Sequence, residues 1–233
     1  MVALPPEGFI RAYHRTKLEH ATSSICSRRL KVATFSDAND PFELLALNLR
    51  GSEHRSARNV LREFKEAQGT QLGMLCFSRQ WENPVLWSHY ADRHKGVCLG
   101  FDVAEDVLDE VTYVDDLLTR RLGDEEDPST IPGDLQDLLF LTKFRRWEYE
   151  NEMRRFVPLS DAQQEAPLFF WPFDERMRLR EVILGPLCSA SHLEPIRHLV
   201  ATANVTALVS KARLSFGSFK VRPNLRYPPT CVK

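Results

Sequence analysis

The sequence predicts an α+β protein, in which strands outnumber helices near the centre of the chain. Two apolar runs, LGMLCFS at 72–78 and KGVCLGFDV at 95–103, have the length and composition of buried strands. In segment 56–69 the apolar residues instead recur at helical spacing, which places Ala57, Val60, Leu61 and Phe64 on one face of a helix. We therefore expect a central sheet with amphipathic helices packed around it.

The segments before residue 72 predict alternating strands and helices. Asp40 is placed to cap a helix, because Pro41 suits the first helical position and Glu43 completes a capping box. Gly69 suits a left-handed cap at the end of the following helix. The predicted elements are strands at 9–16 and 30–35, and helices at 17–30, 40–50 and 56–69.

After residue 103 the chain predicts an edge strand, an inserted loop and a further group of strands and helices. The loop, 121–134, is acidic and contains Pro128, Pro132 and Gly133, which are typical of exposed loops. The other predicted elements are strands at 111–116, 152–159, 178–185 and 213–223, and helices at 135–144 and 192–203.

Composition indicates an ordinary globular protein. The chain has 233 residues, of which 43% are hydrophobic and 27% charged, with a formal net charge of −1. No long linker interrupts the predicted elements, so we expect a single domain over 1–233. General binding to nucleic acid requires a basic excess that this chain lacks. Any contact with nucleic acid is therefore expected to be local.

Cysteine spacing and the N-terminal sequence predict a cytoplasmic protein. The five cysteines stand far apart without a CxxC pair, which fits neither a disulfide framework nor a zinc cluster. The N-terminus has no basic start, and no run approaches the ~20 apolar residues of a membrane span. The histidines form no HExxH motif. We therefore expect no metal site and no membrane partner.

Reactive side chains crowd into WSHYADRHKGVCLGFD, residues 87–102, where a polar stretch runs into the second buried strand. Trp87 and Tyr90 offer flat rings that suit either stacking on a heteroaromatic ligand or packing in a core. His14 lies on the first predicted strand, where an imidazole suits either a structural hydrogen bond or a ligand hydroxyl. No GxGxxG, P-loop or nucleophile elbow occurs, which argues against a Rossmann enzyme, a phosphate-loop NTPase and an α/β-hydrolase.

Two carboxylates and a guanidinium follow one another in WEYENEMR, residues 147–154. Strand alternation would place Glu150, Glu152 and Arg154 on one face. Two interpretations stay open. One is a solvated face with cross-paired charges, and the other is a carboxylate that arginine keeps ionised in a cleft, poised to stabilise a cation.

Four ordered blocks, FSDANDPFE, LCFS, LWSHYADRHKGVCLGFD and WEYENEMR, resemble the bacterial family of domain of unknown function 2971. The match spans roughly residues 10–190, and the WSHYA…HKGVCLGFD block is its most specific part. Members of this family often lie near mobile or defence genes. The resemblance therefore implies a bacterial protein, with antiviral defence or toxin activity as its setting.

A second resemblance is to the His-Tyr-Glu layout of ADP-ribosyltransferases. It implies a central, mostly antiparallel split sheet flanked by helices, with NAD as the substrate. In this layout His14 would hold the adenosine ribose, Ser78 would follow the next motif strand, and Tyr90 would stack on nicotinamide. Glu152 would be the catalytic carboxylate, with Glu150 as the competing match.

The same resemblance implies how the rest of the polar block would act. Trp87 and His89 would line the cofactor cleft, and Lys95 or Arg154 would meet the pyrophosphate. Breaking the nicotinamide–ribose bond develops an oxocarbenium ion, which a positioned carboxylate stabilises mainly in the transition state.

The expected function is transfer of ADP-ribose from NAD to a protein or nucleic acid, or to water. The alternative is a non-catalytic domain of the same fold that senses a nucleotide or binds a partner protein. A third hypothesis is a metal-independent nuclease that uses His14, His89 and Glu152, although the near-neutral net charge argues against it.

Overall fold

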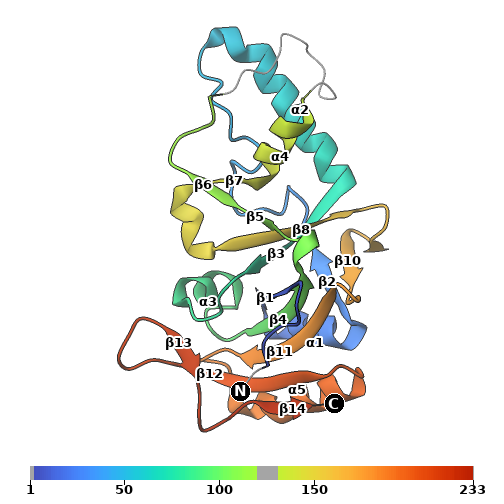
Figure 1. Ribbon diagram of the computed structural model, residues 1–233, viewed down its shortest axis with the longest axis vertical. Helices are drawn as coiled ribbons and strands as arrows, with labels where there is room; N and C mark the ends of the chain where they lie inside the picture. The colour runs from blue at the N-terminus through green and yellow to red at the C-terminus, as the bar shows by residue number, and fades with distance from the viewer. Residues whose placement is uncertain (1–2, 120–130, 233) are drawn as a thin grey trace.

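The computed structural model describes residues 3–119 and 131–232, so most of the predicted acidic loop at 121–134 lies outside the described residues. Its largest sheet has the strand order β13-β12-β11-β4-β1-β3-β8-β5, with β14 also paired to β12 (Figure 1). Among these pairs, β11 and β12 are parallel and the others are antiparallel. The α+β class and the mostly antiparallel sheet are thus confirmed. The strands of this sheet are β1 (Phe9–Thr16), β3 (Leu72–Ser78), β4 (Val97–Ala104), β5 (Asp109–Glu110), β8 (Glu152–Pro158), β11 (Met177–Leu184), β12 (Ala207–Leu214), β13 (Val221–Pro223) and β14 (Thr230–Val232).

The sheet is nearly divided between β1 and β3. Strand β1 pairs with β4 along its whole length, from Phe9 opposite Ala104 to Thr16 opposite Val97. In contrast, β1 meets β3 at one residue pair, Tyr13 opposite Ser78. The strands therefore pair continuously within each half of the sheet, and an opening is left between the two halves.

Five α-helices within the described residues surround this sheet (Figure 1). Helices α2 and α4 lie at one end of the molecule, whereas α5 and β14 lie at the other end, near both termini. The helices are α1 (Leu18–Ser27), α2 (Arg55–Gln71), α3 (Pro84–Tyr90), α4 (Gly133–Leu141) and α5 (Leu193–Thr202). Smaller sheets are formed by β2 (Arg29–Val32), β10 (Leu168–Pro172) and β9 (Gln163–Glu165), and by β6 (Thr112–Val114) and β7 (Thr142–Phe144).

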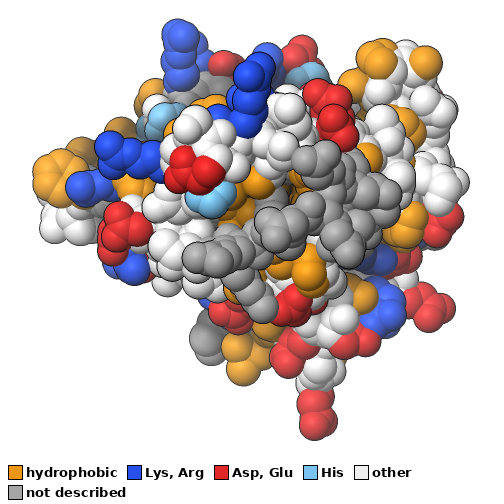
Figure 2. Space-filling model, turned by 90° about the horizontal axis from the view of Figure 1, so that it is seen from above, with side chains coloured by type: hydrophobic (Ala, Val, Ile, Leu, Met, Phe, Trp, Pro, Cys, Tyr) orange, Lys and Arg blue, Asp and Glu red, His pale blue; other side chains and the backbone are white. Residues whose placement is uncertain are grey.

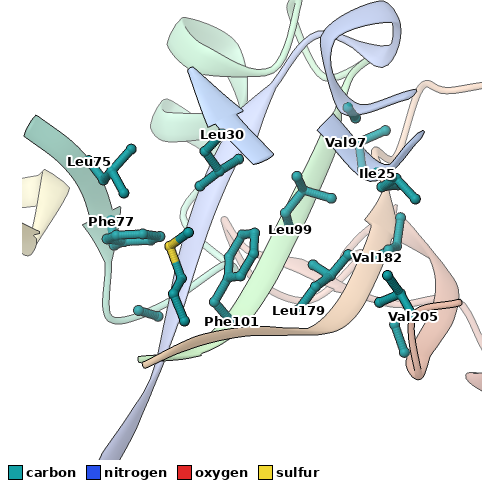
Figure 3. Close-up of a cluster of buried hydrophobic side chains, with 14 of the residues drawn as sticks. Ile25, Leu30, Leu75, Phe77, Val97, Leu99, Phe101, Leu179, Val182 and Val205 are labelled. Atoms are coloured by element: carbon teal, nitrogen blue, oxygen red, sulfur yellow. The ribbon is translucent and has the colours of Figure 1, made fainter. Parts of the chain in front are cut away.

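The largest hydrophobic core lies between the sheet and helices α1 and α5. Figure 3 shows Ile25 of α1 and the strand residues Leu99, Phe101 and Val182 pointing into it. A second core packs α2 and α4 against the opposite side of β3, because alternate residues of a strand point to opposite faces. Strand β3 is thus buried on both faces, which explains its continuous apolar run.

Most of the predicted elements are present, with shifted ends. The strands predicted at 9–16 and 72–78 are confirmed, and the strand predicted at 95–103 and the helix predicted at 192–203 are found at 97–104 and 193–202. Helix α2 continues through Gly69 to Gln71, so the prediction of a cap at Gly69 was wrong. The predicted helix over 135–144 ends at Leu141, where β7 begins. The predicted strand at 213–223 is a hairpin, because β12 ends at Leu214 and β13 begins at Val221.

The prediction of a helix over 40–50 is also wrong, since residues 41–44 form a turn and residues 45–50 contain only an isolated bridge at Leu47. Asp40 does accept a bond from the backbone N–H of Phe42, at 2.9 Å, as a capping residue would. However, Leu44 adopts a left-handed conformation with φ of 62°, which ends the turn. The Glu43 side chain is buried against Arg154 instead of closing a capping box.

No helix within the described ranges is long and apolar enough to cross a membrane. All five cysteines lie in those ranges, and all are free thiols.

Candidate functional site

A cavity of about 300 Å³ lies at the opening between β1 and β3. This volume is at the lower end of the range of small-molecule sites, about 300–1,000 Å³. The cavity brings together six of the residues that the sequence analysis singled out, from β1, β3, α3 and the segment around β8. These residues are His14, Ser78, Tyr90, Glu150, Glu152 and Arg154.

The register of β3 and β8 explains part of this arrangement. Ser78 pairs with Glu152, and Cys76 pairs with Arg154, so these side chains share one face of the sheet. Glu150 reaches the same cavity by a different route, because β8 begins only at Glu152. Glu150 ends a 3₁₀-helix, and Asn151 follows it in the left-handed conformation. The prediction that Glu150 and Glu152 alternate along one strand was therefore wrong, although both carboxylates face the cavity.

Tyr90 comes from the end of α3, a helix that the sequence analysis treated as part of a polar stretch between strands. The signal for this helix was present in the sequence. Asn83 caps it by accepting a bond from the N–H of Val85 at 2.9 Å, and Pro84 occupies its first turn. This short helix turns the Tyr90 phenol toward the Glu150 carboxylate, to which it donates a hydrogen bond.

The carboxylates of the cavity are held in a buried network of charges. Lys143 Nζ donates to Glu150 Oε2 at 2.6 Å and to Glu152 Oε2 at 2.8 Å. Arg154 Nε donates to Glu152 Oε1 at 2.9 Å, and its two terminal nitrogens bind Glu43 at 2.6 and 3.0 Å. Both oxygens of Glu152 are thus occupied, whereas Glu150 has one cationic partner.

These contacts determine the charge of Glu152. Burial alone would raise the pKa of Glu152, but the attraction of Arg154 and Lys143 outweighs burial and lowers this pKa to about 2. Glu152 is consequently ionised at any physiological pH. Burial, together with Glu150, raises the pKa of Tyr90 above its usual value, so the phenol stays protonated as a donor.

Arg15 is a cavity residue that the sequence analysis did not single out. Its guanidinium donates to Ser78 Oγ at 3.2 Å and to the carbonyl oxygen of Gln80 at 2.5 Å, while its buried Nε has no partner. The side chain is 7% exposed, and no carboxylate of the described residues lies within 4.0 Å of it. Burial lowers the pKa of Arg15. An arginine with this surplus of donors is suited to bind an anion.

His14 bridges the two halves of the sheet. Its Nδ1 lies 3.0 Å from the carbonyl oxygen of Cys76, where the backbone ladder between β1 and β3 is interrupted. The ring also meets Phe77 edge-on. Burial lowers the pKa of His14, so the imidazole is neutral near pH 7 and can donate from Nδ1 to this carbonyl. Nε2 is then left as an acceptor on the half-buried ring.

Three predicted cofactor-binding residues do not line the cavity. Trp87 is fully buried in a small core beneath α3, and its Nε1 donates to the carbonyl oxygen of Trp81 at 2.5 Å. His89 and Lys95 are exposed. Because His89 is outside the cavity, the residues of the nuclease hypothesis are not assembled in one place.

Arg154 lines the cavity, but its predicted contact with a pyrophosphate is not supported. The side chain is completely buried, and every terminal nitrogen already binds an oxygen of Glu43, Glu152 or Phe140. Arg154 instead fits the second interpretation of segment 147–154, in which an arginine keeps a carboxylate ionised.

Lys143 and Glu43 were also missed as cavity residues. The sequence pattern predicts the end of a helix at Lys143 and a capping box at Glu43. No local signal in the sequence marks either residue, because their partners lie on β8 and on the 3₁₀-helix that precedes it.

The fold and the cavity define a class of α+β protein with a charged cleft at the opening of a mostly antiparallel sheet. The chain finds no match among protein-family models, curated proteins or solved structures. Both resemblances drawn from the sequence therefore stay predictions, and any functional conclusion depends on the residues of the cavity.

Proposed function

We propose that this protein is an ADP-ribosyltransferase-like enzyme, which binds NAD and cleaves its nicotinamide–ribose bond. The observation that carries the proposal is the convergence of His14, Tyr90, Glu150 and Glu152 in one cavity, from three segments that are far apart in the chain. Transfer of ADP-ribose to a protein, a nucleic acid or water, in bacterial defence or as a toxin, is the role that we infer from the resemblances. A cytoplasmic location is part of the same proposal.

The distribution of charge in the cavity supports NAD as the substrate. In the buried charge network of the cavity, the three carboxylates of Glu43, Glu150 and Glu152 exceed the two cations of Lys143 and Arg154 by one formal charge. Arg15 lines the same cavity and lacks a carboxylate partner among the described residues. NAD has the matching polarity, because its nicotinamide–ribose end is cationic and its pyrophosphate is anionic.

The reaction would use this charge in the transition state. As the bond to nicotinamide breaks, positive charge moves onto the ribose, and a fixed carboxylate stabilises it without reorganising. We assign this contact to Glu150, because its Oε1 is shared only with the neutral Tyr90 phenol. Glu152 would position Lys143 and Arg154 around the site. His14 would hold the distal ribose through Nε2.

A pair of variants tests the proposal. We expect Glu150→Gln to lower the rate of nicotinamide release from NAD by about 10²–10³-fold, because it removes one charge aimed at the developing cation. Its melting temperature should change less than that of Glu152→Gln, which leaves Arg154 and Lys143 short of a partner. Chromatography of nicotinamide and ADP-ribose measures the rate.

The matched control is Glu148→Gln, because Glu148 lies exposed on the same 3₁₀-helix. Its turnover should equal that of the unmodified protein. Unchanged turnover in both the Glu150→Gln and Glu152→Gln variants would show that neither carboxylate acts on NAD, and would reject the assignment.

Arg15 gives a second test, on binding. Replacement by glutamine should weaken ADP-ribose binding by about 10-fold or more, because hydrogen bonds to charged groups contribute about 1.5–3 kcal/mol. Binding of nicotinamide riboside, which has no phosphate, should be unchanged. Isothermal titration of both ligands provides the comparison, and equal weakening of both would mean that Arg15 only supports the shape of the cavity.

One observation favours the non-catalytic alternative. Lys143 already bridges the two candidate carboxylates, as it would in a pocket that binds a nucleotide without reacting. This alternative predicts that NAD raises the melting temperature while no nicotinamide is released.

A further inference from the structure

The hairpin of β12 and β13 carries two phenylalanines with no packing partner. Phe216 and Phe219 are 100% and 98% exposed, on the turn between the two strands. In Figure 2, hydrophobic side chains project at the left edge beside lysine and arginine side chains, on the side where Figure 1 places this hairpin. Exposed large apolar groups gathered at one point mark a surface for interaction.

The strands behind these rings carry unpaired positive charge. Arg213 of β12 stands directly opposite Arg222 of β13, and Lys220 adjoins the same strand. Like charges directly opposite each other destabilise a strand pair. Within the described part of the chain, none of these three cations forms an ion pair, and the Arg213 guanidinium lies 5.9 Å from the Phe216 ring centroid.

This local charge departs from the charge of the whole chain. The 39 residues from Pro195 to Lys233 include seven lysines and arginines and no aspartate or glutamate, whereas the formal net charge of the protein is −1. The hairpin is therefore a basic protrusion on an otherwise acidic molecule. Its charge complements a polyanion, and the low net charge limits such binding to this surface.

We propose that this hairpin binds single-stranded nucleic acid. Proteins that bind single strands combine cations along the backbone with aromatic side chains on which bases stack. Arg213 and Arg222 are two of the three unpaired cations of the hairpin, and arginine both pairs with phosphate and stacks on rings, whereas a lipid surface requires only positive charge. The rings are also accessible for stacking, since Phe216 and Phe219 are almost completely exposed.

The base of the hairpin is fixed, so the tip is presented on a rigid support. The N–H of Val221 donates to the carbonyl oxygen of Glu82 at 2.8 Å, just before α3. Val221 and Ala212 are fully buried in the small core around Trp87. The proposal does not depend on NAD chemistry, because it concerns a surface that contains no residue of the cavity.

Fluorescence anisotropy with a labelled 20-nucleotide oligo-dT tests the proposal. We expect binding whose log–log dependence on salt has a slope of about −0.7 for each phosphate contact. Phe216→Ser/Phe219→Ser should weaken binding about 10-fold or more at constant slope, because each stacked base contributes about 1–3 kcal/mol. Arg213→Gln/Arg222→Gln should weaken binding and make the slope shallower by about 1.4.

Arg62→Gln is the matched control, because Arg62 is exposed on α2, away from the hairpin. This variant should bind as the unmodified protein does, and all variants should keep its melting temperature. Absence of binding to the oligonucleotide at low salt would overturn the proposal, and so would binding that the two phenylalanine substitutions leave unchanged. Sedimentation with phosphatidylglycerol vesicles, without oligonucleotide binding, would identify a lipid surface instead.

Discussion

Replacement of Arg154 by methionine is expected to lower the free energy of unfolding by about 3–5 kcal/mol. The Arg154 side chain is completely inaccessible, and it is the main counter-charge of two buried carboxylates, Glu43 and Glu152. Methionine fills much of the same volume but leaves Glu43 without a partner. Urea unfolding followed by circular dichroism at pH 7 measures the loss.

The effect of this substitution should depend on pH. Burial raises the pKa of Glu43, and Arg154 opposes that rise. Without the arginine, the folded-state pKa of Glu43 moves further above its unfolded value of about 4.3. A carboxyl group whose pKa is raised on folding contributes stability that is lost as pH increases through the folded pKa. The Arg154→Met variant should therefore be less destabilised at pH 5 than at pH 8.

Two further variants separate charge from packing. Arg154→Met/Glu43→Leu should recover part of the lost stability, because apolar replacement of a whole buried ion pair is often neutral. Arg155→Met, one residue along β8, should cost less, because its partner Asp174 is 29% exposed and can be hydrated. Equal losses for Arg154→Met and Arg155→Met would contradict the view that the buried network stabilises the cavity.

The sequence predicted the parts of the site that depend on local pattern. The strand that carries Ser78 was recognisable as a short apolar run bounded by polar residues, and the strand that carries Glu152 was recognisable from its alternating pattern. Lys143 and Arg15 were missed for a different reason. Lys143 is important because its partners lie on other elements of the fold. Arg15 is important because no carboxylate of the described residues pairs with it. Neither property is visible in a single local segment.

Glu43 shows how a tertiary contact overrides a local signal. Residues 40–43 have every feature of a helix start, including the aspartate, the proline and the glutamate. The buried Arg154 guanidinium binds both oxygens of Glu43, and breaking such a buried pair costs about 3–5 kcal/mol, more than the ~0.5–2 kcal/mol lost with a helix cap. The capping pattern at residues 40–43 is therefore a valid local signal, but the buried contact of Glu43 with Arg154 determines the structure of this segment.

Replacement of Trp87 by alanine is expected to lower the free energy of unfolding by about 3–5 kcal/mol. The indole is fully buried and packs α3 against Cys98 of β4 and Ile183 of β11. The same core holds Val221 at the base of the hairpin. The substitution removes a large ring from a close-packed space, so the cavity that it leaves adds to the lost hydrophobic burial.

Trp87→Phe is the matched control for this prediction. Phenylalanine keeps most of the packing but loses the N–H that donates to the carbonyl oxygen of Trp81, so the expected loss is about 1–3 kcal/mol. Because the indole faces the core and not the cavity, NAD binding by the Trp87→Phe variant should match that of the unmodified protein. A Trp87→Ala variant of normal stability that no longer binds NAD would instead place the ring at the cofactor, as the resemblance to ADP-ribosyltransferases implies.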